Sequence, residues 1–318
     1  MDRDIMQGNT MENREVEKFK ASPAYETVTK YIALLDKEIQ ESKTLGDTKR
    51  DWDLGRSSPG ATTPIHAFLQ RIKRIIDEVP LEEDDQRYGN RGFIVFLERV
   101  TKEGSSLIKE VLLNGGASKT TEALATYLEA SFGNKTRIDY GTGHELNFFC
   151  FLIVLHTAGL VATQELFSAL EHYFALVRLL ILKYKLEPAG SHGNWGIDDY
   201  QLLPFLLGSS QFCKRNDLSF ASLFESKHKD LCFSKALRFV HVHKSCSSLR
   251  YTFEERIAQY EETEVTEEPF EKHSPMIYSL KDVPFSKINR GMIKMYDGVV
   301  LSKYVVIQHF IGSDFLQM

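Results

Sequence analysis

The 318-residue chain has little of what marks disulfide-rich, zinc-binding or nucleic-acid-binding proteins. It has four cysteines, and they stand apart at Cys150, Cys213, Cys232 and Cys246 without any C-x-x-C pair, so neither a disulfide framework nor a zinc site is indicated. Its net charge of −5 offers no excess of lysine and arginine to neutralise phosphates. We therefore expect reduced thiols and no nucleic-acid partner.

The chain also lacks a long apolar run. The most apolar stretch, from Phe148 to Leu155, is about half of the roughly 20 residues that a bilayer-spanning helix needs. Residues 1–17 are polar and acidic and have no apolar segment of the kind found in signal peptides. We expect a buried core helix at Phe148, no membrane partner, and a cytoplasmic location with the nucleus as a second one.

What the chain does have is apolar residues at helical spacing. With 42% apolar and 11% aromatic residues it can bury a large core. Alternation typical of strands is weak, so the sequence predicts an all-α protein. The predicted helices cover 24–39, 63–76, 93–101, 107–113, 120–132, 145–156, 163–184, 198–207, 219–224, 230–242, 288–296 and 299–310, and the sixth and seventh are expected to form a central hairpin.

The segment from Thr136 to Glu145 has the residue types of an anion site, directly before an apolar helix. Its two glycines permit close backbone approach, Thr142 can cap the helix or meet a phosphate oxygen, and Arg137 offers a planar guanidinium. A glycine-hinged helix start with a local Arg137–Asp139 ion pair fits the same residues, so both interpretations stay open. The G-x-G lacks the continuation of a dinucleotide-binding or P-loop motif.

The segment from Glu187 to Tyr200 contains three glycines, Trp195 and the adjacent acids Asp198 and Asp199. Carboxylates beside open backbone carbonyls suit Mg²⁺, although either aspartate could instead cap a helix. No H-E-x-x-H set and no G-x-S-x-G elbow is present, so the residues alone name no reaction.

Three long motifs carry a resemblance to a known family: RIDYGTGHE (137–145), EPAGSHGNWGIDDYQLLPFLLGSSQ (187–211) and MYDGVVLSKYVVIQHF-IGS (295–313). They resemble the protein phosphatase 2A activator family, also called phosphotyrosyl phosphatase activator, and the likeness runs from about Phe19 to Ser313. It implies an all-α unit of core, linker and lid lobes around a deep cleft. The expected domain is 18–313, with tails at 1–17 (flexible) and 314–318 and an acidic insertion at about 246–268.

The resemblance also implies an activity. Family members bind ATP and Mg²⁺, dock on the protein phosphatase 2A catalytic subunit, alone or with its scaffold subunit, and help it load its metals, with ATP hydrolysis expected only in that complex. They also accelerate cis/trans isomerisation in proline-containing peptides. Isomerisation needs no covalent chemistry, because a cleft that holds the twisted imide better than the planar one lowers a barrier of roughly 18–20 kcal/mol.

Carried over by position, the family's functional residues fall into four sets. Nucleotide contacts are expected at Arg137, Ile138, Asp139, Thr142, Gly143, Gln308, His309 and Phe310. Magnesium ligands are expected at the Gly193 carbonyl and the Asp199 carboxylate. We assign Asp139, Tyr140 and Trp195 to the isomerase surface, and Asn194, Gly208 and Met295 to the partner surface.

Some positions depart from the family pattern. His192 and Asn194 stand where many relatives carry Gln and Val, and the segment at Pro284 to Lys287 is shortened. These departures predict altered contacts with the partner. A different class of function also fits the residues, namely a non-catalytic helical scaffold that recruits basic partners through the acidic segment from Glu254 to Glu271.

Overall fold

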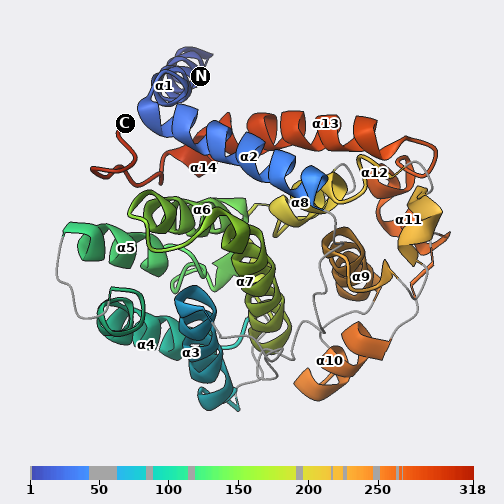
Figure 1. The fold of residues 1–318 in the computed structure, drawn as a ribbon, viewed down its shortest axis with the longest axis horizontal. Helices are drawn as coiled ribbons and strands as arrows, with labels where there is room; N and C mark the ends of the chain where they lie inside the picture. The colour runs from blue at the N-terminus through green and yellow to red at the C-terminus, as the bar shows by residue number, and fades with distance from the viewer. Residues whose placement is uncertain are drawn as a thin grey trace.

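The computed structural model describes residues 2–42, 63–83, 89–113, 119–190, 196–215, 218–224, 228–245, 251–262, 265–266 and 268–318. In these ranges the regular secondary structure is almost entirely helical, which confirms the all-α prediction (Figure 1). The elements are α1 (Asp2–Lys20), α2 (Pro23–Glu41), α3 (Pro64–Glu78), α4 (Gly92–Leu107), η1 (Ile108–Leu112), α5 (Lys119–Glu129), β1 (Asp139–Tyr140), α6 (Thr142–Thr157), α7 (Thr163–Tyr184), β2 (Glu187–Pro188), α8 (Leu203–Ser210), η3 (Phe220–Phe224), α9 (Cys232–Ser245), α10 (Phe253–Glu262), α11 (Glu268–His273), α12 (Pro275–Tyr278), α13 (Phe285–Tyr296), η5 (Asp297–Leu301) and α14 (Tyr304–Ile307).

The predicted central hairpin is present as α6 and α7. Every residue from Glu145 to Leu155 of α6 and from Ala169 to Tyr184 of α7 is buried, because both helices are predominantly apolar and are covered all round. Helices α2, α3, α4 and α10 contact α7, while α5 and α14 contact α6 (Figure 1). No helix in the described ranges is long and apolar enough to cross a membrane.

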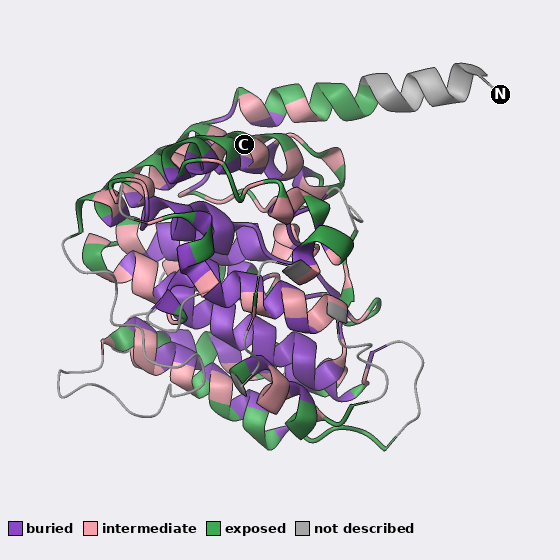
Figure 2. Cartoon of the chain, turned by 90° about the vertical axis from the view of Figure 1, so that its right-hand side faces the viewer, coloured by how far each residue is buried: buried purple, intermediate pink, exposed green. Residues whose placement is uncertain are grey.

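Helix α1 occupies the region where a flexible tail was expected, and it extends away from the body (Figure 2). Its last turn is attached: the rings of Phe19 and Phe310 lie 4.9 Å apart, and Lys20 Nζ lies 3.2 Å from the carboxylate of Asp297. Tyr25, at the start of α2, donates its hydroxyl proton to the same Asp297 at 2.7 Å. The first two helices therefore hold the segment that leads into α14.

The two short helices expected over 93–101 and 107–113 form one continuous stretch, in which α4 passes into the π-helical η1. Gly104 lies inside α4, where an added Cβ would stand 2.9 Å from Leu128 of α5. This glycine serves the close approach of two helices.

The helix expected over 198–207 is only partly present, since α8 begins at Leu203. The carboxylate of Asp198 accepts the backbone N–H groups of Tyr200 and Gln201 at 3.1 and 3.2 Å. A short acidic side chain that binds nearby N–H groups stabilises a turn in place of a helix. Residues 196–202 consequently form a non-helical segment that leads to α8.

The acidic segment from Glu254 to Glu271 lies mostly in α10 and α11 within the described ranges. Arg256, Tyr260 and Phe270 are buried, while Glu254 and Glu255 are exposed. Helix α10 contacts α7 and α9, so this region is packed on the body by one face.

Candidate functional site

The two glycine-containing segments singled out in the sequence lie side by side. Strands β1 and β2 pair in parallel, with Asp139 opposite Glu187 and Tyr140 opposite Pro188. The N–H of Ala189 donates to the carbonyl of Tyr140 at 2.8 Å. Each strand has only two residues, which is too short for an alternating pattern to predict it. The pairing makes the two segments parts of one site.

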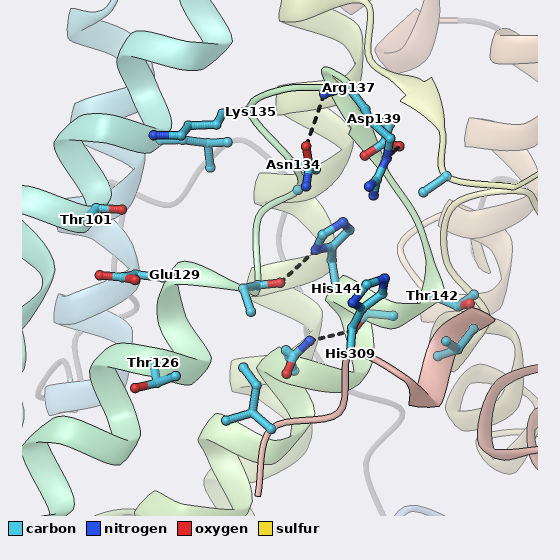
Figure 3. A pocket seen from close by; sticks show the side chains of 18 of the residues that line it. Thr101, Thr126, Glu129, Asn134, Lys135, Arg137, Asp139, Thr142, His144 and His309 are labelled. Atoms are coloured by element: carbon cyan, nitrogen blue, oxygen red, sulfur yellow. Dashed lines mark hydrogen bonds and ion pairs between the residues drawn. The ribbon is translucent and has the colours of Figure 1, made fainter. Parts of the chain in front are cut away.

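A cavity of about 1040 Å³, here called the main cavity, lies between these segments and helices α4, α5 and α14 (Figure 3). This volume is at the upper end of what small-molecule sites usually have. Its walls combine cationic, acidic and apolar side chains. The lining residues that come from the predicted nucleotide set are Arg137, Asp139, Thr142, Gly143, Gln308 and His309.

The N-terminus of α6 forms one wall of the main cavity. Gly141 is the residue before the helix, its backbone is extended, and it provides no side-chain cap. Thr142 and Gly143, the first two helical residues, both line the cavity. The first N–H groups of a helix have no partner within it and carry partial positive charge, so this wall can receive an anion.

Gly141 is required by the close packing of the two segments. A Cβ added there would stand 3.0 Å from the Cβ of Ala189 and 3.2 Å from its carbonyl oxygen. Ile138, three residues earlier, has a φ of +50°, a conformation that β-branched residues rarely adopt. The backbone of this segment is thus held in an unusual shape next to the cavity.

Arg137 and Asp139 form the ion pair that the alternative interpretation of this segment contained. Arg137 Nε donates to Asp139 Oδ2 at 2.5 Å, and the arginine side chain is 54% exposed while the aspartate is 7% exposed. The other oxygen, Asp139 Oδ1, is buried and has no hydrogen-bond partner within the described ranges. A buried polar atom without a partner costs roughly 1–3 kcal/mol, so Oδ1 is suited to accept from a ligand. The ion pair and a binding site coexist here.

His144 lines the main cavity and was missed as a site residue in the sequence. Its Nδ1 donates to the carbonyl oxygen of Ala130 at 2.8 Å, and its ring lies 5.7 Å from that of Tyr140. Burial lowers the pKa of His144, which favours the neutral imidazole. Its position directly after the G-x-G and before the apolar helix is the signal that could have identified it.

The wall opposite β1 was also missed. It is formed by exposed residues of two helices, Glu98, Thr101 and Lys102 on α4 and Thr126 and Glu129 on α5 (Figure 3). No pattern distinguishes them from an ordinary solvated helix face. Only the packing of α4 beside α5 makes them part of a cavity.

Glu145, the residue after His144 on α6, connects α6 to the segment that leads into α8. It is fully buried, and its carboxylate accepts the N–H groups of Leu202 and Leu203 at 3.1 Å, at the start of α8. The pKa of Glu145 is raised to about 8. Burial is the main cause, and the nearby charge of Asp198 acts in the same direction. The contact fixes segment 196–202 against α6.

The sequence profile of the family described as "Phosphotyrosyl phosphate activator (PTPA) protein" matches residues 7–318. The chain belongs to this family. A serine/threonine-protein phosphatase 2A activator from Encephalitozoon cuniculi is 33% identical, over 94% of this chain and 94% of its own. Serine/threonine-protein phosphatase 2A activator 2 from Saccharomyces cerevisiae is 36% identical, over 78% of this chain and 67% of its own.

A solved structure of a family member has the same fold. The crystal structure of the PP2A phosphatase activator Ypa1 superposes with a TM-score of 0.74 and 27% sequence identity, covering 95% of this chain and 91% of that one. The family identified from the three motifs in the sequence is therefore confirmed, and so is its helical fold.

Some residues carried over from the family do not line the main cavity. Tyr140 is fully buried, and its hydroxyl lies 2.8 Å from that of Tyr173, so its side chain packs in the interior and does not line the main cavity. Burial raises the pKa of Tyr140 well above its usual value. Ile138 and Phe310 pack half-buried against the core; the ring of Phe310 contacts Phe19.

Two of the residues predicted for the partner surface, Gly208 and Met295, lie in the described ranges. Gly208 is buried in α8, where an added Cβ would stand 2.5 Å from the backbone nitrogen of Phe233, so it serves the packing of α8 on α9. Met295 is half-buried on α13 and packs against the core.

Of the two predicted magnesium ligands, only Asp199 lies in the described ranges. Its side chain is half-buried and does not line the main cavity. Gly193, Asn194 and Trp195 lie outside the described residues. Within the described ranges no three His, Cys, Asp or Glu side chains are grouped to hold a metal ion.

Proposed function

We propose that the protein binds ATP with Mg²⁺ in the main cavity and activates the catalytic subunit of protein phosphatase 2A. The observation that carries the proposal is the convergence of both glycine-containing segments and the chain after α14 on one cavity. The partner is supported by the relatives from Encephalitozoon cuniculi and Saccharomyces cerevisiae, which are named as activators of this phosphatase.

The main cavity has what a nucleotide requires. The N-terminus of α6 and the guanidinium of Arg137 offer donors and positive charge for phosphates. Leu97, Val306 and Ile311 provide apolar surface for a base, and the volume of about 1040 Å³ exceeds that of the ligand. In this proposal phosphates lie at α6, and the remainder of the nucleotide extends along the cavity.

A magnesium ion, when bound, would neutralise phosphate charge. We assign it, as the family resemblance implies, to the carboxylate of Asp199 and the carbonyl of Gly193. The Glu145 carboxylate fixes Leu202, three residues after Asp199, against α6, so Asp199 lies on a segment attached to the wall of the main cavity although it does not line the cavity itself. Arg137 and the α6 N-terminus then orient the phosphates relative to that segment.

The proposal is tested by calorimetry of ATP-Mg²⁺ binding and by reactivation of a metal-depleted phosphatase catalytic subunit. Arg137→Ala should weaken both, because it removes the cavity guanidinium. Arg99→Ala is the matched control, since Arg99 pairs with Glu78 and Glu103 on the surface and does not line the main cavity. If the unaltered protein binds no ATP-Mg²⁺, or if Arg137→Ala activates normally, the proposal fails.

A second proposal is peptidyl-prolyl isomerase activity in the same cavity. It is favoured by apolar residues that line the same cavity as the unpaired oxygen of Asp139, including Val305, which is 67% exposed. Such a surface can hold a proline ring while a polar group contacts the twisted imide. Asp139 and Trp195 remain the residues assigned to this role. A proline-peptide assay in which Asp139→Asn and Val305→Asp leave the rate unchanged would argue against it.

A further inference from the structure

The α6 end of the main cavity offers hydrogen-bond donors from Arg137 and from the first N–H groups of α6. Among the acceptor atoms of the lining residues are Asp139 Oδ1, which is buried without a partner in the described ranges, and Nε2 of His144. A site that combines donors with a separate pair of acceptors can distinguish the parts of a ligand.

His144 Nε2 is an acceptor because of what the other ring nitrogen does. Nδ1 donates its proton to the carbonyl oxygen of Ala130, which fixes the tautomer and leaves Nε2 without hydrogen in the neutral ring. The charged groups that face the ring are Asp139 of β1, Arg137 before it and His309 after α14. Asp139, His144 and His309 all line the cavity, and Figure 3 labels the three side chains.

Phosphate is a poor match for the two acceptors. Phosphate oxygens are themselves acceptors and carry negative charge, so a buried carboxylate oxygen repels them. Hydroxyl groups are donors and satisfy such oxygens and nitrogens well. In a nucleotide whose phosphates lie at the N-terminus of α6, the sugar is the next part of the molecule.

We propose that Asp139 Oδ1 and His144 Nε2 together accept hydrogen bonds from the ribose hydroxyls of the nucleotide, and that they select ribonucleotides over deoxyribonucleotides. The inference rests on the proposed nucleotide site and deepens it. It gives His144 a specificity-determining role. It also explains why one oxygen of Asp139 is buried without a partner while the other pairs with Arg137.

The test is a set of calorimetric titrations with ATP, 2′-deoxy-ATP, 3′-deoxy-ATP and tripolyphosphate. The variant is His144→Asn, whose amide can still donate to Ala130 but which has no atom in place of Nε2. A matched control is His156→Asn at the other end of α6, where the imidazole binds Tyr31 and Thr163 outside the cavity. Thermal unfolding of each variant verifies that it is folded.

The unaltered protein and His156→Asn should bind at least one deoxy analogue about tenfold more weakly than ATP, the size expected for one lost hydrogen bond to a buried acceptor. His144→Asn should bind ATP about tenfold more weakly, lose that discrimination, and bind tripolyphosphate normally. His144→Phe, which keeps a ring beside Tyr140, should behave in the same way.

Two results overturn the inference while leaving the proposed function intact. One is equal binding of ATP and both deoxy analogues by the unaltered protein. The other is an equal loss of ATP and tripolyphosphate affinity in His144→Asn, which would place the imidazole at the phosphates. Absence of any nucleotide binding by the unaltered protein overturns the proposed function, and the inference with it.

Discussion

Replacing Glu145 with glutamine should remove a large part of the pH dependence of stability. The carboxyl is fully buried and its pKa rises to about 8 from the usual 4.5, chiefly through burial. A folded pKa above the unfolded value means that the folded state binds the proton more tightly. The contribution of the protonated Glu145 carboxyl to the free energy of unfolding is therefore complete below about pH 4.5 and is lost as the pH rises through about 8.

The magnitude follows from the two pKa values. Each pKa unit corresponds to about 1.4 kcal/mol, so the free energy of unfolding should fall by at most about 5 kcal/mol between the two limits. Glutamine has no titrating proton but keeps one oxygen that can accept the N–H of Leu202 or Leu203. The free energy of unfolding of Glu145→Gln should therefore fall less steeply with rising pH than that of the unaltered protein.

Urea unfolding at a series of pH values from 5 to 8.5 measures this difference. Glu165→Gln is the matched control, because the Glu165 carboxylate also caps a helix start, accepting the Ala162 N–H at 2.8 Å, far from the cavity. If the difference in unfolding free energy between the unaltered protein and Glu145→Gln stays constant over this range, the reasoning is refuted.

Three further changes have defined outcomes. Gly208→Ala should lower the free energy of unfolding by about 1–3 kcal/mol in urea unfolding, because its Cβ would meet the backbone of α9 at 2.5 Å, whereas Gly291→Ala on α13, with open space around it, should not be destabilising. Asn289→Ala should cost about 1–3 kcal/mol in the same assay, since its amide donates to the Asp36 carboxylate at 2.9 Å and is nearly completely buried; an unchanged midpoint would contradict this role. Arg137→Ala should weaken ATP binding about ten- to a hundredfold by calorimetry, and an unchanged affinity would place the phosphates elsewhere.

Long apolar periodicity predicted the helices that form the centre of the fold. The predicted helix over 163–184 has the same bounds as α7, and Pro64 marks the start of α3. Helix starts fixed by distant contacts could not be predicted in this way. Helix α8 begins at Leu203, where the carboxylate of Glu145 caps it from another helix, and nothing in the local sequence shows that contact.

Residue type and chain position led to several residues that line the main cavity. Arg137 lies just before β1, and Thr142 and Gly143 are the first two residues of the apolar helix α6. Tyrosine and glycine occur both at binding surfaces and in packed interiors, so the sequence alone does not show where Tyr140 and Gly208 lie. In the structure both residues are buried. The acidic and hydroxyl residues of α4 and α5 become part of the cavity only through tertiary packing.

The pairing of β1 with β2 has a consequence for how this protein can vary. Because the Ala189 N–H bonds the Tyr140 carbonyl, and Gly141 packs on the Ala189 side chain, the two segments share one backbone geometry. A substitution in one segment changes the space left for the other. Mutations on the two sides should therefore be strongly non-additive, and natural sequences should change these positions together.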